Sequence, residues 1–322
     1  MTAAGSESRP IRIGISACLM GQAVRFDSGH KKDAFLMGTL GRFVEWLPVC
    51  PEVECGLGTP RESMRLVRRP EGVALVTVRS AIDLTRRMET FVAARAGAIA
   101  RDDLSGFVFK KDSPTCGLAR VKVYDPNGSP SKDGRGLFAS AVVERCPHLP
   151  VEEEGRLSDP RLREAFIERV FAYWRLRNLF MSRWTVGSLV AFHTAQKLIL
   201  MAHSPEAYRR LGQIVASARA TPRAELEQRY TAGFMTGLAS LATPGRHANV
   251  LQHMAGYFKE HLDAASKEEL LAAIDDYRRG LVPLMVPITL VRHHVRVHAV
   301  AYLAGQQYLE PHPNELMLRN HV

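Results

Sequence analysis

The chain has 322 residues, of which 46% are hydrophobic and 24% charged, and its net charge is +10. This composition excludes a disordered chain, and the length predicts about two domains, each able to bury a core. The longest apolar run, 281–291, is shorter than the roughly 20 residues that a membrane span needs and contains two prolines, which argues against a membrane protein. Residues 1–10 contain no apolar segment, so we expect no signal peptide and a cytoplasmic protein.

The positive charge is concentrated in the second half of the chain. Residues 1–160 contain 23 Lys and Arg against 20 Asp and Glu, a balance of +3, whereas residues 161–322 contain 20 against 13, a balance of +7. The second half also holds ten of the twelve histidines. Surplus positive charge favours a polyanionic partner such as nucleic acid, although ordinary solvated lysine and arginine side chains explain the same numbers.

The first half alternates short apolar runs with helical patterns. Helices are expected near 31–46 and at 84–101, and strands are expected at 11–19, 43–50, 73–78 and 105–111. Such alternation is typical of an α/β domain, with a mostly parallel sheet flanked by helices. The stretch 124–136 is dense in turn-forming residues and is predicted to be a loop.

The second half predicts an all-α domain. Ser158 or Asp159 is the expected N-cap of its first helix, with Pro160 in the first turn. Further helices are predicted at 188–201, 205–218, 224–241, 248–261, 266–279 and 286–305. We place the boundary in the acidic, glycine-containing segment 151–159, which gives an α/β domain at 1–158 and a helical domain at 159–322.

Three cysteines follow predicted strands. Cys18 ends the strand at 11–19, Cys50 ends the strand at 43–50, and Cys116 follows the strand at 105–111. Because the carboxyl ends of parallel strands gather at one edge of a sheet, these thiols are expected to converge. Their wide spacing excludes a compact zinc knuckle, and three thiolates suit a soft metal or an iron–sulfur cluster. For any one of them, a small buried hydrophobic residue is the alternative.

The other two cysteines give weaker signals. Cys146 is predicted to be a buried thiol, and Cys55 has no clear role from spacing alone. The five cysteines are an odd number in a protein expected to be cytoplasmic, so no disulfide framework is predicted.

Three segments of the first half, ISACLMGQAVRFDSGHK, PVCPEVECGLGTPR and KKDSPTCG, resemble the signature segments of the TudS-like thiouracil desulfurases. The resemblance implies a [4Fe–4S] cluster held by Cys18, Cys50 and Cys116, with one iron free of protein ligands. It also implies a catalytic glutamate at Glu52 and a catalytic serine at Ser113.

The chain departs from that family at Cys55, where the family usually has a glycine. A fourth thiolate there would block the open iron. We interpret Cys55 as a bystander, because the adjacent Gly56 keeps the turn flexible.

The second half resembles the YbgA-type helical domain. The matching stretches are LVAFHTAQKLILMAHSPEAYRRLG, NVLQHMAGYFK, YRRGLVPLMVPITLVRHHVR and YLAGQQYLEPHPNELMLRN. The two domains in this order resemble the RudS-type tRNA 4-thiouridine desulfidases, which implies tRNA as a partner, and we do not expect DNA.

The implied chemistry is hydrolysis of a C–S bond without net redox change. An open iron would bind the soft sulfur of a thiocarbonyl, and water would add to the ring carbon. Glu52 would transfer the protons and Ser113 would orient the water or the substrate. The sulfur would leave as hydrosulfide.

Other polar residues are candidates for substrate or RNA contacts. Asp27, Lys31 and Arg61 match the family segments and are expected to line the pocket, or Arg61 pairs with a carboxylate. Glu54 is interpreted as a surface or loop carboxylate, and His294 with His298 as a weak candidate for a metal pair. Seven basic residues are candidates for gripping phosphates: Lys197, Arg209, Arg210, Arg278, Arg279, Arg292 and Arg296.

Two other functions stay open from the sequence. One is a desulfidase for free thiolated bases or nucleosides, with a helical half that is only structural. The other is a non-catalytic, metal-bound RNA-binding protein. The basic helical half favours tRNA over free bases, and Glu52 and Ser113 beside the cysteines favour an enzyme.

Overall fold

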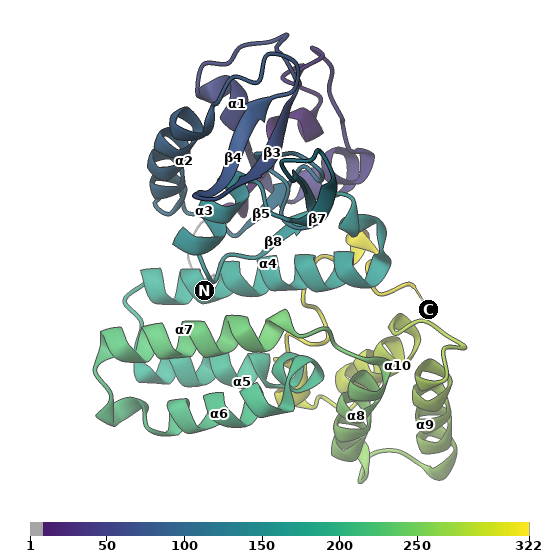
Figure 1. The fold of residues 1–322 in the computed structure, drawn as a ribbon. Coiled ribbons are helices and arrows are strands. Elements are labelled where there is room, and N and C mark those ends of the chain that lie inside the picture. Colours follow the sequence, from purple (N-terminus) through teal and green to yellow (C-terminus); the bar gives the residue numbers. More distant parts are fainter. Residues whose placement is uncertain (1–8, 322) are drawn as a thin grey trace. The chain divides into compact units, whose positions relative to one another are not determined.

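The computed structural model of the chain describes residues 9–321. Most of the first ten residues, where no signal peptide is expected, therefore lie outside the described range. The chain divides into two compact units, Met1–Ser158 and Asp159–Val322. In Figure 1, where colour follows the sequence, the first unit runs from purple to teal and the second from teal to yellow. Among the described residues, no helix combines the length and the apolar character that crossing a membrane requires.

A parallel sheet forms the core of the first unit. Its strand order is β2-β1-β5-β8, and all of its neighbouring strands run parallel. The bounds of these strands are β1 Arg12–Ser16, β2 Glu45–Val49, β5 Gly106–Phe109 and β8 Val151–Glu153. The central strands β1 and β5 are almost wholly buried, as expected for parallel strands covered on both faces.

An aromatic cluster packs on the central strands β5 and β1. Phe107 and Phe109 stack with their ring centroids 4.2 Å apart, and both meet the edge of Phe138 at 5.7 and 6.0 Å. Gly14 in β1 makes room for this cluster, because a Cβ at that position would lie 2.2 Å from the ring of Phe107. The glycine is therefore required by close packing.

A second, mixed sheet was not predicted. Its strand order is β4-β3-β6-β7, with β3 parallel to β6 and the outer pairs antiparallel. Its strands are β3 Met64–Arg69, β4 Gly72–Thr77, β6 Val121–Tyr124 and β7 Pro130–Gly134. The unit's helices are α1 Pro51–Glu54, α2 Thr85–Ile99 and α3 Leu137–Arg145, and α2 and α3 pack together beside the sheets (Figure 1).

Two predictions for the first unit were wrong. The stretch 124–136 is not a loop throughout, because residues 130–134 form β7, which pairs with β6 in a hairpin despite the turn-rich composition. The predicted helix near 31–46 is a π-helical turn at Phe35–Thr39 and a 3₁₀ turn at Leu40–Arg42, followed by β2. Two glycines in that short stretch weaken a regular α-helix.

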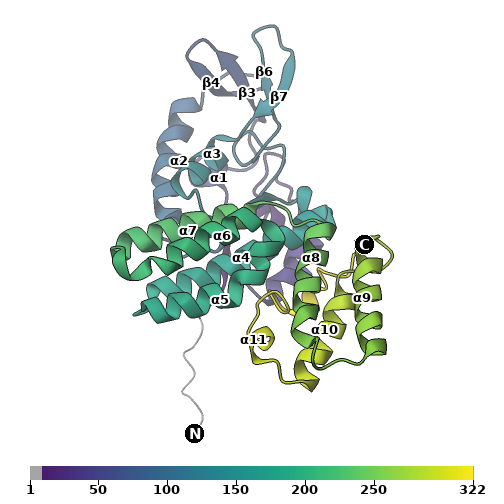
Figure 2. The ribbon, with the colours of Figure 1, turned by 90° about the horizontal axis from the view of Figure 1, so that it is seen from below.

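The second unit is helical, so the predicted fold class, an α/β domain followed by an all-α domain, is confirmed. Helices α4 to α7 lie together, and α8 to α10 form a second group that joins them through contact between α5 and α8 (Figure 2). Their bounds are α4 Pro160–Met181, α5 Val186–His203, α6 Pro205–Ala216, α7 Arg223–Ala239, α8 Pro244–Ala255, α9 Ala264–Arg278, α10 Met285–Val297 and α11 Ala301–Ala304.

Helix starts follow the predicted capping chemistry. The carboxylate of Asp159 accepts hydrogen bonds from the backbone N–H groups of Arg161 and Leu162, at 2.9 and 3.1 Å, and Pro160 occupies the first turn. The single helix predicted at 286–305 was wrong, since Ala299 has a φ of 49° and separates α10 from α11. A left-handed residue cannot continue a right-handed helix.

A buried ionic network links distant parts of the helical unit. Arg319 donates from Nε to Glu164 at 3.0 Å and from a terminal nitrogen to Glu168 at 2.8 Å. His203 Nε2 lies 2.7 Å from the other oxygen of Glu168. Burial opposes charge on Glu168, but its hydrogen bond to His203 and the nearby positive charges prevail and lower its pKa. Each buried charge in the network is therefore stabilised only by the opposite charges that it contacts.

We expect Arg319→Met to lower the free energy of unfolding by about 3–5 kcal/mol, because it leaves two buried carboxylates without their cation. Urea denaturation of the full chain measures this. The matched control is Arg229→Met, which breaks a surface pair with Glu225 whose side chains are half exposed, and which should cost less than about 1 kcal/mol. Similar small costs for both variants would contradict the importance of the network.

Candidate active site

The three predicted cysteines line one cavity of about 370 Å³ in the first unit. Cys18 lies in a 3₁₀ turn directly after β1, and Cys50 directly follows β2 as the N-cap of α1. Cys116 lies in the loop that follows β5. All three positions are at the carboxyl edge of the parallel sheet, where open α/β sheets place their ligand sites.

Burial sets the electrostatics of these thiols. It raises the pKa of Cys18 to about 11, although the positive charge of Lys110 opposes the shift. It also raises the pKa of Cys50, against hydrogen bonding from the backbone of Val53. The pKa of Cys116 is raised further, by burial and then by the charge of Glu52. These sulfur atoms are therefore neutral thiols at pH 7 unless a cation is bound to them.

The short helix α1 fixes the backbone of Cys50. Glu54 accepts a hydrogen bond from the backbone N–H of Cys50 at 2.8 Å, and its other carboxylate oxygen pairs with Arg95 at 3.0 Å. Pro51 begins the helix, as expected for a first-turn proline. Glu54 is exposed, as expected for a surface carboxylate, and from its place on this helix it holds the first turn.

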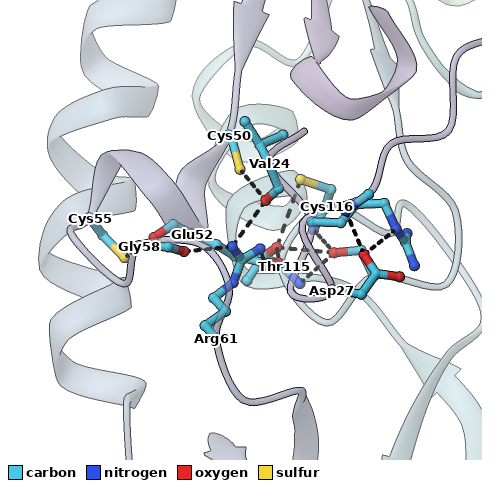
Figure 3. Close-up of polar contacts among 12 residues, drawn as sticks. Val24, Asp27, Cys50, Glu52, Cys55, Gly58, Arg61, Thr115 and Cys116 are labelled. Atoms are coloured by element: carbon cyan, nitrogen blue, oxygen red, sulfur yellow. Dashed lines mark hydrogen bonds and ion pairs between the residues drawn. The ribbon is translucent and has the colours of Figure 1, made fainter. Parts of the chain in front are cut away.

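Glu52 is held at both oxygens of its carboxylate. Oε1 accepts a hydrogen bond from the hydroxyl of Thr115 at 2.7 Å, and Oε2 forms an ion pair with the guanidinium of Arg61. The side chain lines the cavity with the thiols and is only 14% exposed. Figure 3 shows Glu52 between Arg61 and Thr115, near Cys50 and Cys116. A carboxylate fixed in this way is suited to proton transfer with a bound water or substrate.

Arg61 was expected either to line the pocket or to pair with a carboxylate, and it does both, since it lines the cavity and pairs with Glu52. One guanidinium nitrogen donates to the carbonyl oxygens of Val24 and Gly58, at 3.0 and 2.9 Å (Figure 3). Its backbone N–H donates to the carbonyl of Phe26 at 2.9 Å. The arginine thus ties three segments together around Glu52.

Ser113 organises the loop that carries Cys116. Its hydroxyl oxygen accepts hydrogen bonds from the backbone N–H groups of Cys116 at 3.1 Å and Thr115 at 3.3 Å. It also lies 3.0 Å from the hydroxyl of Thr115, which donates to Glu52. A chain of hydroxyls therefore runs from Ser113 to Glu52. Gly136 allows the loop to pack closely, since a Cβ there would lie 2.4 Å from the carbonyl oxygen of Thr115.

The two remaining pocket candidates differ. Lys31 lines the cavity, and its backbone N–H donates to the carbonyl of Cys18 at 2.9 Å. Asp27 does not line the cavity, so its predicted place in the pocket was wrong. Its exposed carboxylate accepts from the N–H of Gly29 at 3.1 Å and lies 3.4 Å from Arg25, and that local turn fixes its direction.

The other two cysteines stay outside the cavity. The sulfur of Cys55 donates to the carbonyl of Glu52 at 3.3 Å, and Figure 3 shows it apart from the sulfur atoms of Cys50 and Cys116. Gly56 keeps a φ of 85°, which agrees with a turn that needs its freedom. Cys146 was predicted to be buried but is only half-buried, because it ends α3 at the unit's surface.

The sequence missed Thr115 and Lys110 as parts of the site. Thr115 is fully buried and bonds Glu52, and Lys110 lines the cavity while pairing with Glu154. Both lie inside the segment KKDSPTCG, but nothing in their residue types signals a role. Within residues 9–321, no group of three or more His, Cys, Asp or Glu side chains is arranged to hold a single metal ion. His294 and His298 instead stack with ring centroids 5.9 Å apart.

The predicted RNA contacts fall on several helices of the second unit. Arg278 and Arg279 share Asp275, and Arg292 pairs with Glu310. Arg292 and Arg296 both line a hollow beside α10. Within the described part of the chain, four candidates have no ion pair: Lys197, Arg209, Arg210 and Arg296.

The fold and the site together define an α/β unit with a three-thiol cavity and a fixed carboxylate, followed by a helical unit. Comparison with known proteins agrees with this division. Residues 13–154 match the model of the 2-thiouracil desulfurase family, and residues 197–313 match a family described as a protein of unknown function (DUF1722).

Two relatives match parts of the chain. The uncharacterized protein YbgA of Escherichia coli (strain K12) is 35% identical over 161 residues, which are 50% of this chain and 95% of that protein. A solved structure of the [4Fe-4S]-dependent thiouracil desulfidase TudS is 30% identical, covers 49% of this chain and 98% of that one, and has a TM-score of 0.40. The chain therefore belongs to the YbgA family and combines a YbgA-type domain with a TudS-like domain, as the sequence predicted.

Proposed function

We propose that this protein removes sulfur from 4-thiouridine in tRNA, with an iron–sulfur cluster held by Cys18, Cys50 and Cys116, and releases uridine and hydrosulfide. The observation that carries the proposal is the meeting of these three thiols with Glu52 in one cavity of a 2-thiouracil desulfurase domain. The coarser activity, cleavage of a C–S bond in a thiolated pyrimidine, follows from the family. The choice of tRNA as substrate rests on the helical unit.

The donor set fits a cluster better than a single ion. In a cubane cluster each thiolate binds a different iron, so its sulfur atoms are spread more widely than around one metal ion. The described residues offer no set for a single ion, yet three thiols face one cavity, those of the buried Cys18 and Cys116 and of the half-buried Cys50. The TudS relative is named as [4Fe-4S]-dependent, which supports the same cofactor here.

A cluster bound through three thiolates supplies one iron without a protein ligand, a Lewis acid suited to the soft sulfur of a thiocarbonyl. The chain's own groups handle protons and position. Glu52 takes a proton from water at one carboxylate oxygen and returns it to the leaving sulfur, since each oxygen keeps a second lone pair beside its bond to Thr115 or Arg61. Ser113 keeps Thr115 and the Cys116 loop in place. Lys110 lines the cavity while paired with Glu154, and its positive charge favours the thiolate form of Cys18.

The helical unit supports tRNA over a free base. The surplus charge of residues 161–322 is +7, from 20 basic against 13 acidic residues. Arg209, Arg210 and Arg296 are exposed, and within residues 9–321 their guanidinium groups have no carboxylate partner, so they are available for phosphates. The alternative substrate is free thiouracil, which the description of the matching family favours.

An anaerobic assay separates these substrates. Purified full-length protein is incubated with tRNA containing 4-thiouridine, with free 4-thiouridine and with 2-thiouracil, and the loss of thiocarbonyl absorbance is followed. We expect the highest kcat/KM on tRNA. Faster turnover of free thiouracil than of thiolated tRNA would contradict the tRNA proposal and leave the desulfidase activity standing.

RNA binding should depend steeply on salt. Roughly six phosphate contacts would lower affinity by orders of magnitude between low and physiological salt, by analogy with DNA. We expect Arg292→Ala with Arg296→Ala to lower tRNA affinity and flatten the salt slope, with iron content unchanged. Arg296→Ala alone should account for most of the loss, because Arg292 is already paired with Glu310. Filter binding across a salt series measures the tRNA affinity and its dependence on salt. An unchanged salt slope would exclude Arg292 and Arg296 as phosphate contacts.

A further inference from the structure

The helical unit contains a second cavity, of about 220 Å³, that takes no part in the proposed desulfidation. It lies over the buried ionic network of Arg319 and is lined by residues of α4, α8 and α9 (Figure 1 labels these helices). Its walls are largely apolar, with contributions from Ala165, Leu241, Ala242, Pro244, Val282 and Leu284.

The network beneath the cavity is electrically balanced. All four carboxylate oxygens of Glu164 and Glu168 have partners, which are Arg319, His203 and His321. Both ring nitrogens of His203 face oxygens that only accept hydrogen bonds, the carbonyl of Ser240 and the carboxylate of Glu168, so the imidazole carries both protons. With Arg319, two cations therefore face two carboxylates. Hydrophobic replacements of such buried networks are often neutral or stabilising, so stability alone is a weak reason for this one.

Two polar atoms at the cavity lack partners. His247 and Tyr277 are only 7% and 9% exposed, and both line the cavity. His247 Nδ1 lies 2.8 Å from the hydroxyl of Tyr308, which leaves Nε2 for another group. Within residues 9–321, neither Nε2 of His247 nor the hydroxyl of Tyr277 has a hydrogen-bond partner, and neither atom is sealed from solvent. Two side chains that are more than nine-tenths buried therefore each keep one polar atom without a protein partner among the described residues at this cavity, where a ligand can bond it.

Glu164 and Glu168 also line the cavity, but their oxygens are all paired within the network, and the charge added beside the network is positive. Arg161 lines the cavity from the first turn of α4, is exposed, and its guanidinium has no partner among the described residues. Its charge also acts on the hydroxyl of Tyr277. Thr243 and Pro244, which begin α8, form another part of the wall. The N-terminal end of α8, capped by a neutral threonine, therefore adds its positive dipole end to the charge of Arg161, whereas the end of α4 is already capped by the carboxylate of Asp159.

These features select the chemistry of the ligand. The balanced network leaves the single charge of Arg161, which favours a monoanion over phosphate. A planar carboxylate matches a guanidinium through two parallel hydrogen bonds. The volume is below the roughly 300–1,000 Å³ of sites for drug-sized ligands, and the apolar walls require a compact apolar body.

We propose that this cavity binds a small organic monocarboxylate. Arg161 and the hydroxyl of Tyr277 hold the carboxylate, the apolar walls enclose the body, and Nε2 of His247 bonds a polar atom of the ligand or a water that it carries. The site is independent of the cysteine cavity, so its failure would leave the desulfidase proposal unaffected.

The test is isothermal titration calorimetry of the full chain with benzoate as the probe, and with benzamide as its neutral counterpart. We expect one benzoate per chain with a Kd below about 1 mM, and benzamide at least about tenfold weaker. Arg161→Gln and Tyr277→Phe should each weaken benzoate by about tenfold or more. The matched control is Lys267→Gln, which removes the same charge from an exposed position of α9 outside the cavity and should leave the Kd unchanged.

Several outcomes would overturn the proposal. No benzoate binding to a chain with normal thermal unfolding would exclude it. Equal affinities for benzoate and benzamide would exclude recognition of a carboxylate, and tighter binding of inorganic phosphate would assign another ligand class. Benzoate binding that Arg161→Gln and Lys267→Gln weaken equally would show general charge attraction only.

Discussion

Replacing Cys116 with alanine is expected to abolish iron and sulfide binding and, with them, all desulfidase activity. Cys116 is one of three thiols at the cavity and is 6% exposed. Its backbone N–H donates to the hydroxyl of Ser113, which fixes the loop that carries it. Two remaining thiolates would leave two irons of the proposed cluster without protein ligands. Iron and sulfide analysis of anaerobically purified protein measures the loss, and circular dichroism verifies that the helices remain.

The controls are the two cysteines outside the cavity. Cys146→Ala and Cys55→Ala should keep the full iron content, because neither thiol lines the cavity. Faster turnover of Cys55→Ala with an intact cluster would mean that Cys55 reaches the open iron after all. Full iron content in Cys116→Ala would refute the ligand assignment.

The sequence predicted the edge of the sheet where the cysteines meet, because strand order matters little to this argument. Any parallel arrangement of β1, β2 and β5 brings their carboxyl ends to one edge, so Cys18, Cys50 and Cys116 were expected together before the order was known. The hairpin of β6 and β7 was missed for the opposite reason. Its first strand, β6, is held by pairing with β3 more than fifty positions away, and β7 in turn pairs with β6, which local turn propensity does not report.

The support around Glu52 lay largely beyond sequence reasoning. Thr115 is a threonine in a loop, and its importance comes from a hydrogen bond to a residue 63 positions earlier. Arg61 offered two equal interpretations, and only its contacts with Val24, Gly58 and Glu52 show that it satisfies both. Asp27 shows the converse case, because matching a family segment did not put its side chain in the cavity.

Glu52→Gln is expected to lower kcat by about 10²–10⁴-fold while the iron content stays unchanged. The amide keeps the volume and can still accept from Thr115, but it cannot take a proton from water. Single-turnover assays on a small thiolated nucleoside measure the effect without a contribution from RNA binding.

Two further variants separate proton transfer from positioning. Thr115→Val removes one hydrogen bond to Glu52 but leaves the carboxylate paired with Arg61, so its loss should stay within about tenfold. Asp27→Asn makes the same charge change as Glu52→Gln on the exposed turn outside the cavity, and should leave kcat within about twofold. If Glu52→Gln turned over as fast as Asp27→Asn, the carboxylate would have no part in the chemistry. If Thr115→Val were as slow as Glu52→Gln, the hydroxyl chain from Ser113 would carry the proton.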